Sequence, residues 1–128
     1  MKVLVVNHAP EARALLSSQL RELGFEPLEA AAMQEAVATL QREGDVTSVL
    51  LGWKLARGSG LDLLRWLRED ARWQGLPVVM VTGMEELGQV TQALDAGASE
   101  YLLEPHDAQT LLEKLLLLGV DPEIRKVA

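Results

Sequence analysis

The sequence predicts an α/β fold in which helices cover both faces of a doubly wound, five-stranded parallel sheet. Short runs of apolar, β-branched residues alternate with segments of helical period, and this alternation occurs five times along the 128 residues. The strand-like runs are almost continuously apolar, which is typical of parallel strands buried between two layers of helices. The connections between such strands are expected to be right-handed.

The first half of the chain contains three strand-like runs and two helix-like segments. Pro10 lies in the first turn of the first helix, Gly24 ends that helix, and Gly44 ends the second. Pro27 lacks an amide hydrogen, so the second strand is expected at an edge of the sheet. The expected elements are strands at residues 3–6, 25–30 and 49–51, with helices at residues 10–23 and 33–43. The expected apolar stripe of the first helix is Ala12, Leu15, Leu16, Leu20 and Leu23.

The second half continues the alternation with two strands and three helices. The run "LPVVMVT" at residues 76–82 is the most β-branched, and "EYLLE" at residues 100–104 is the last strand. Helices are expected at residues 61–72, 86–96 and 107–118. The expected inward residues are Leu63, Leu64, Leu67 and Ala71 of the third helix, Leu87, Val90, Ala93 and Leu94 of the fourth, and Leu111, Leu115 and Leu118 of the last. On the last helix Leu112 flanks the stripe, Leu116 extends it and Leu117 points outward.

Length, charge and cysteine content restrict the class of protein. The 128 residues suit one domain, expected at residues 1–118, with residues 119–128 as a C-terminal tail. The net charge of −7 argues against partners that present phosphate groups, so neither nucleic acid nor an anionic membrane is expected. The chain has no cysteine, which excludes disulfides and thiolate metal sites. No run is long enough for a signal peptide or a membrane span, and a cytoplasmic location is therefore expected.

Candidate functional residues follow four of the predicted strands. In a parallel sheet of this type the site lies at the carboxyl ends of the strands, near the point where the strand order reverses. The residues at those ends are Asn7 and His8, Gly52 and Trp53, Thr82 and Gly83, and Glu104 and Pro105.

Several landmarks along the chain fall in register with a known family. Gly60 follows Gly52 by eight residues, Thr82 ends the fourth predicted strand, and Tyr101 and Pro105 lie in and after the fifth. The stretches "GLDLLRWLR", "LPVVMVTG" and "AGASEYLLEP" complete the pattern. Over roughly its first 118 residues the chain resembles the receiver domain of two-component response regulators, without a gap. The resemblance implies a flavodoxin-like sheet with the strand order 2-1-3-4-5.

The resemblance also implies a site for phosphoryl transfer, which this sequence has lost in part. In the family two acidic residues hold a divalent cation, an aspartate accepts the phosphoryl group, and a lysine pairs with its oxygens. The corresponding residues here are Asn7 and His8 for the acidic pair, Gly52 for the aspartate and Glu104 for the lysine. Glycine offers no nucleophile, and His8 is a poor ligand for Mg²⁺, which prefers hard oxygen ligands. Of the family's site residues, Thr82 alone is retained.

We therefore expect an atypical, stand-alone receiver domain, or pseudo-receiver, that has no enzymatic activity and binds no Mg²⁺. It would act in signal transduction by binding a protein partner, independently of phosphorylation. Two alternatives stay open. One is a receiver in a two-component phosphorelay that responds to a phosphodonor by an altered route. The other is a small-ligand sensor that uses the space left by the missing side chain at Gly52.

For two pairs of residues the sequence suggests specific contacts, each with an alternative. His8 and Glu104 form an ion pair across the strand ends in one hypothesis, whereas in the other His8 faces solvent. Trp66 and Trp73 are seven residues apart and lie off the apolar stripe of the third helix, which would make an exposed partner surface. The alternative is that Trp73, at the helix end, folds over the next loop.

The surface around the last helix is the second candidate for protein binding. The resemblance implies that the fourth helix, fifth strand and fifth helix form the usual dimer and output surface, and a homodimer through these elements is one expected assembly. Tyr101 and Pro105 keep the residue types of the family's aromatic switch position and of the position after the fifth strand. Leu116 and Leu117 broaden the apolar face of the last helix. The alternative is an ordinary amphipathic helix with one exposed leucine.

Overall fold

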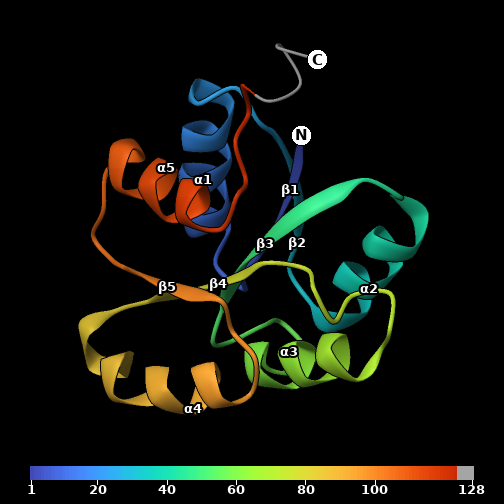
Figure 1. Cartoon of the computed structure of the whole chain (residues 1–128). Coiled ribbons are helices and arrows are strands. Elements are labelled where there is room, and N and C mark those ends of the chain that lie inside the picture. The colour runs from blue at the N-terminus through green and yellow to red at the C-terminus, as the bar shows by residue number, and fades with distance from the viewer. Residues whose placement is uncertain (124–128) are drawn as a thin grey trace.

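The computed structural model describes residues 1–123 and contains a five-stranded parallel sheet with the strand order β2-β1-β3-β4-β5 (Figure 1). The strands are β1 (Lys2–Val6), β2 (Glu26–Ala30), β3 (Val46–Gly52), β4 (Val78–Thr82) and β5 (Glu100–Leu103). The helices are α1 (Pro10–Glu22), α2 (Met33–Arg42), α3 (Gly60–Glu69), α4 (Val90–Asp95) and α5 (Ala108–Leu117), with a 3₁₀ helix, η1 (Met84–Gln89), before α4. The predicted fold class and strand order are confirmed.

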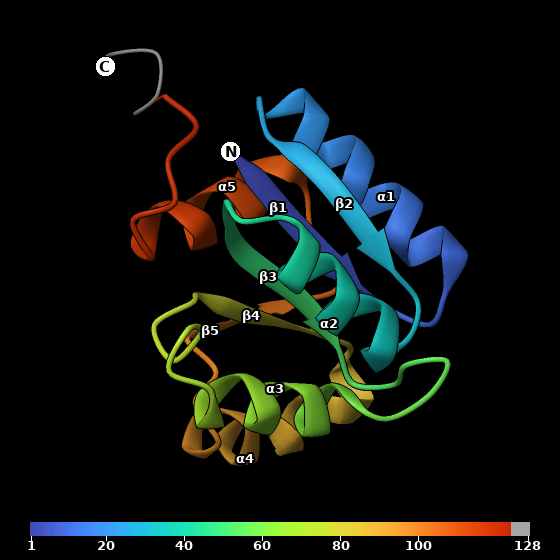
Figure 2. The same ribbon diagram turned by 90° about the vertical axis from the view of Figure 1, so that its right-hand side faces the viewer.

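Helices cover both faces of the sheet and enclose two separate cores. Helices α1 and α5 lie on one face, and α2, α3 and α4 lie on the other, as the two views of Figures 1 and 2 show. Successive side chains of a strand point to opposite faces. Val3 and Val5 of β1 therefore join the core beneath α1 and α5, whereas Leu4 and Val6 join the core beneath the other helices. This division explains why the inner strands are apolar without alternation.

The edges of the sheet and its point of reversal are set by β2, β1 and β3. Pro27 of β2 pairs in register with Val3 of β1. The strand β2 lies at an edge of the sheet, as predicted. The chain leaves β1 toward β2 on one side and returns to β3 on the other, so the strand order reverses at β1. The carboxyl ends of β1 and β3 are adjacent, with Val6 paired to Leu51. The residues that follow these two strands are thereby brought to one place.

Two predicted helices differ in the structure from what the sequence pattern indicated. The predicted fourth helix is a 3₁₀ helix up to Gln89, and only Val90–Asp95 is α-helical. Gly88 lies at this junction, and glycine weakens a regular helix because it gains backbone freedom when unfolded. The third helix ends at Glu69 because Asp70 has extended backbone angles and accepts a hydrogen bond from the amide of Arg72, at 2.9 Å.

Some residues expected to face inward are exposed instead. The exposed fractions are 50% for Leu15, 44% for Leu94 and 43% for Leu116, and Ala71 is also exposed. Ala71 lies beyond the end of α3. The three leucines lie at the flanks of their apolar stripes, and they are exposed because each helix contacts the sheet over a narrower face than its stripe. Leu117 is 72% exposed and points outward as predicted.

The C-terminal end of the described chain packs onto the body of the protein. Val120 is buried in the core beneath α1 and α5, and its amide donates to the carbonyl of Leu115 at 2.9 Å. The division into a domain at 1–118 and a tail stays a prediction, and residues 124–128 of that tail lie outside the described residues. Between residues 1 and 123 no helix has both the length and the apolar character that a membrane span requires.

Candidate functional site

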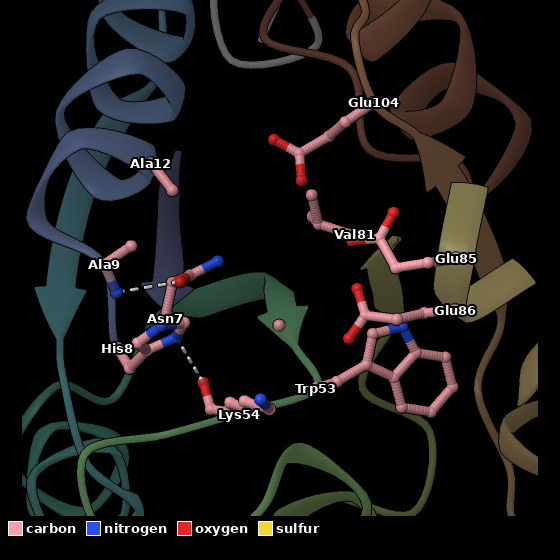
Figure 3. Close-up of a pocket in the computed structure, with 11 residues that line it drawn as sticks. Asn7, His8, Ala9, Ala12, Trp53, Lys54, Val81, Glu85, Glu86 and Glu104 are labelled. Carbon is pink, nitrogen blue, oxygen red and sulfur yellow. Dashed lines mark hydrogen bonds between the residues drawn. The ribbon is translucent and has the colours of Figure 1, made fainter. Parts of the chain in front are cut away.

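A pocket of about 270 Å³ opens at the carboxyl ends of the strands (Figure 3). Asn7 and His8 reach it from the end of β1, Gly52 from the end of β3, and Glu104 from the end of β5. The predicted site residues from these three strands are thus brought together. Thr82 is fully buried and does not line this pocket.

The space beside Gly52 is filled by the side chain of Asn7. A β-carbon added to Gly52 would lie 2.7 Å from Nδ2 and 3.1 Å from Cγ of Asn7. The Asn7 side chain is only 8% exposed, and its Oδ1 accepts a hydrogen bond from the amide of Ala9 at 3.0 Å. The amide of Asn7 therefore occupies the volume directly beside Gly52, and the pocket at the strand ends is the space that remains.

His8 faces solvent and does not pair with Glu104. Its ring Nδ1 lies 3.2 Å from the carbonyl oxygen of Lys54, and its main-chain amide donates to the same oxygen at 3.3 Å. Neither a hydrogen bond nor an ion pair joins His8 to Glu104 among residues 1–123, where both are described. The two side chains lie on opposite sides of the pocket in Figure 3. The solvent-facing interpretation of His8 is the one the structure supports.

Three carboxylates make the side of the pocket opposite His8 acidic. Glu85 and Glu86 of η1 line it together with Glu104, and Figure 3 shows their carboxylates directed toward the pocket. Sequence reasoning identified Glu104 and missed the other two. A signal for them was present, since they follow the end of β4 by three and four residues and β4 ends at the same edge of the sheet.

Thr82, the retained family residue, is engaged by the indole of Trp53. Nε1 of Trp53 donates a hydrogen bond to Oγ1 of Thr82 at 2.9 Å, and the Thr82 hydroxyl donates to the carbonyl of Gly83 at 3.2 Å. Trp53 is 9% exposed and belongs to the core beneath α2 and α3. The Thr82 hydroxyl therefore serves to join the ends of β3 and β4, and it is not directed at the pocket.

Gly60 holds the loop after β3 close to the end of that strand. Its amide donates to the carbonyl of Trp53 at 2.8 Å, and a β-carbon at this position would collide with the carbonyl oxygen of Gly52. The side chain of Ser59 caps α3 by accepting from the amide of Asp62 at 3.1 Å. The glycine that carried the family resemblance thus has a steric function that does not depend on phosphorylation.

Tyr101 and His106 are partly buried and contact α5 and α1 respectively, whereas Pro105 between them is exposed. The ammonium of Lys114 lies 4.8 Å from the ring centre of Tyr101 and 3.2 Å from a carboxylate oxygen of Glu100. Pro105 is exposed, and the peptide bond that precedes it is cis. His106 is partly buried, with Nε2 2.8 Å from Oε1 of Gln19. Burial lowers the pKa of His106, and the nearby carboxylates only partly oppose this effect.

Trp66 and Trp73 pack against each other and against the core. Their ring centres are 5.2 Å apart with the planes inclined at 31°, and both side chains are half-buried. The guanidinium carbon of Arg72 lies 4.2 Å from the ring centre of Trp73. The two rings stabilise the end of α3 and the loop that follows, so the prediction of an exposed tryptophan surface is not supported.

The donors at the pocket do not suit the Mg²⁺ ion that the family resemblance implies. Mg²⁺ binds one or two carboxylates in near-octahedral geometry, whereas the family's metal positions here hold the amide of Asn7, the imidazole of His8 and no side chain at Gly52. Oδ1 of Asn7 is already engaged with the amide of Ala9. Among residues 1–123 no group of three or more His, Cys, Asp or Glu side chains is arranged to hold a metal ion.

Fold and pocket together define an α/β protein of the doubly wound class, with a pocket at the reversal of strand order. The family described as the response regulator receiver domain matches residues 3–116, and the chain belongs to that family.

Curated relatives match over nearly their whole length. The chain is 34% identical to chemotaxis protein CheY1 of Helicobacter pylori over 123 residues, which covers 94% of this chain and 99% of the relative. It is 33% identical to chemotaxis protein CheY of Pseudomonas aeruginosa over 115 residues, covering 90% and 93%. Among solved structures, a response regulator from Chloroflexus aurantiacus superposes with a TM-score of 0.85 at 23% identity, covering 92% of this chain and 97% of the other. That structural likeness supports the fold.

Proposed function

We propose that this domain is a pseudo-receiver that acts in signal transduction by binding a protein partner, independently of phosphorylation. The observation that carries the proposal is the packing of the Asn7 amide into the space where a side chain at position 52 would stand. The family's phosphoryl acceptor belongs at that position, and glycine supplies no oxygen nucleophile. The proposed protein is neither an enzyme nor a Mg²⁺-binding protein.

Two further features support the proposal. Glu104 places negative charge where the family's lysine would pair with phosphoryl oxygens, so a phosphoryl group would be repelled at the end of β5. The Thr82 hydroxyl is held by the indole of Trp53. The acceptor is thus missing, a carboxylate stands in place of the lysine, and the threonine hydroxyl is engaged by Trp53.

A protein is the proposed partner because the charge of the chain disfavours the other large classes. The net charge of −7 opposes binding to nucleic acid and to anionic lipid. We also propose a cytoplasmic location, which is where receiver domains meet their protein partners. The relatives described above are chemotaxis proteins, and we extend to this chain the role of a signalling domain without its particular pathway.

Intact-mass spectrometry tests the proposal directly. The wild-type chain is incubated with acetyl phosphate and Mg²⁺, and no phosphoryl adduct is expected because the acceptor and the metal ligands are missing. The matched positive control is the variant Asn7→Asp/His8→Asp/Gly52→Asp/Glu104→Lys, which restores the family's residues and should gain one phosphoryl group.

A stoichiometric adduct on the wild-type chain would contradict the proposal. Peptide mapping of that adduct to Glu85, Glu86 or Glu104 would favour the alternative of a phosphorelay receiver with an altered route. The small-ligand alternative stays a prediction, because Asn7 fills only the volume directly beside Gly52 and Gly52 still lines the pocket of about 270 Å³.

A further inference from the structure

A second, larger pocket adjoins the one described above. Its volume is about 430 Å³, and it lies between α1, η1 and the residues that follow β5. Glu85 and Glu104 line both pockets, so the two are adjacent; we call the first the inner pocket, the second the outer pocket, and both together the strand-end groove. The exposed side chains of Leu15 and Met84 contribute to its outer part.

The groove presents carboxylates that the folded chain does not neutralise. Glu85, Glu86 and Glu104 take part in no ion pair among residues 1–123. No lysine or arginine lines the outer pocket, and Lys54 is the basic side chain at the inner one. Carboxylates that outnumber the basic side chains around them favour a cationic occupant.

Apolar side chains lie beside these carboxylates. Leu15 is 50% exposed and Met84 is 65% exposed, which makes them two of the five large apolar side chains that are exposed in the described chain. They come from α1 and η1, on different sides of the outer pocket. An occupant that covers both would remove apolar surface from water, which a small inorganic cation could not do.

Asn7 presents a hydrogen-bond donor to the same groove. Its side chain is more than nine-tenths buried, and Oδ1 is engaged, whereas Nδ2 donates no hydrogen bond to any residue from 1 to 123. Figure 3 shows this amide nitrogen directed toward the centre of the inner pocket. A donor in this position can give a hydrogen bond to an acceptor on an occupant of the groove, such as a carbonyl oxygen.

We propose that the strand-end groove binds a basic segment of a partner protein. An arginine or lysine side chain lies among Glu85, Glu86 and Glu104, and a neighbouring apolar side chain packs on Leu15 and Met84. A main-chain carbonyl of the segment accepts a hydrogen bond from Nδ2 of Asn7. This assignment rests on the proposed function, since it identifies the surface and the chemistry of the protein partner. A polypeptide fits because one molecule then supplies the cation, the apolar group and the acceptor.

Nuclear magnetic resonance of the isotope-labelled full chain tests the assignment. The probe is the capped peptide acetyl-Leu-Arg-Leu-Arg-amide, and the control peptide has citrulline, the neutral isostere, in place of each arginine. The arginine peptide should shift the amides of Asn7 and of residues 83–86 and the methyl groups of Leu15 and Met84. The citrulline peptide should bind about tenfold more weakly, because hydrogen bonds to charged groups are the stronger ones.

Two variants that each remove three negative charges distinguish binding in the groove from attraction to the overall negative charge of the protein. Glu85→Gln/Glu86→Gln/Glu104→Gln should lose about tenfold in affinity for the arginine peptide. Glu22→Gln/Glu69→Gln/Glu113→Gln changes exposed glutamates elsewhere and should bind like wild type. Equal affinity of both variants, or equal shifts with the citrulline peptide, would overturn the assignment.

Two further measurements would reveal a different occupant of the groove. The same shifts with Mg²⁺ alone would assign the groove to a metal ion, and concentration-dependent shifts of the unliganded chain would assign it to a second copy. Either result overturns the proposal. These outcomes are distinct from failure of the proposed function, which shows itself only as a phosphoryl adduct in the mass measurement.

Discussion

Asn7 and Gly52 form a packed pair at the end of the two central strands. The amide of Asn7 stands 2.7 Å from where the β-carbon of residue 52 would be, and its Oδ1 bonds the amide of Ala9. The two positions therefore share one space at the strand ends. A side chain at position 52 would require the amide of Asn7 to shift.

The substitution Gly52→Ala should lower the free energy of unfolding by about 1–2 kcal/mol, because the new methyl group displaces Asn7 from its hydrogen bond to Ala9. Combining it with Asn7→Ser should cost less than the sum of the single changes by at least about 0.5 kcal/mol, since serine leaves room for the methyl group. Urea unfolding of the four proteins measures this coupling. Strictly additive values would show that the two positions do not share the space.

His106 makes stability depend on pH. Burial lowers its pKa in the folded chain below the ordinary value of 6.5. As the pH falls through that value, the unfolded chain takes up a proton that the folded chain does not, so the free energy of unfolding decreases. Urea unfolding at a pH near neutrality and at one about 1.5 units lower should show a smaller decrease for His106→Asn than for wild type. Equal decreases in the two proteins would contradict the prediction.

At the scale of elements, the ends of β3 and β4 are joined by a side-chain hydrogen bond. The Trp53 indole reaches across from the loop after β3 to the Thr82 hydroxyl at the end of β4. Both side chains are buried, so the bond is shielded from water. The amide of Gly60 donates to the carbonyl of Trp53, which holds the start of α3 against the same loop. These contacts fix one side of the candidate site.

The substitution Thr82→Val should destabilise the protein by about 2 kcal/mol, because it leaves the buried indole N–H of Trp53 without a partner. Loss of the same hydrogen bond in Trp53→Phe should lower the free energy of unfolding by less, since the Thr82 hydroxyl keeps its bond to the carbonyl of Gly83. A double-mutant cycle followed by thermal or urea unfolding should give a coupling energy of about 1 kcal/mol between the two positions. A coupling near zero would remove the proposed link between β3 and β4.

At the scale of the whole molecule, apolar side chains remain exposed on α4 and α5. Leu94, Leu116 and Leu117 are all more than two-fifths exposed, whereas Leu111 and Leu115 of α5 are fully buried in the core. The residues on the outer side of α5 therefore add nothing to the monomer's core. They are available for the homodimer through α4, β5 and α5 that the sequence led us to expect, and which stays a prediction.

Light scattering coupled to size-exclusion chromatography tests the dimer. Wild type should show a mass above that of the monomer at high concentration, and Leu116→Glu/Leu117→Glu should be monomeric because charge is introduced into the apolar contact. This double variant should keep the wild-type unfolding temperature, since the altered side chains are exposed. A monomeric wild type at every concentration would contradict the dimer prediction.

The sequence by itself determined the architecture, because periodicity, glycine and proline are local signals. The alternation of apolar runs gave a parallel sheet covered on both faces, and Pro27 gave its edge strand. The sequence also predicted that the strand-end residues would meet, because parallel strands end at the same edge of the sheet. The pocket contains Asn7, His8, Gly52 and Glu104. Where a helix is short and only partly in contact with the sheet, as for Leu94, the local pattern overestimated the buried face.

The tertiary structure alone decided how these side chains are used. No sequence pattern states that the amide of Asn7 fills the place of residue 52, that Trp53 binds Thr82, or that Trp66 and Trp73 stack on each other. The inclusion of Glu85 and Glu86 in the groove is of the same kind. Such contacts depend on distances of a few ångströms between residues far apart in the chain, and those distances are fixed only when the helices and strands pack together.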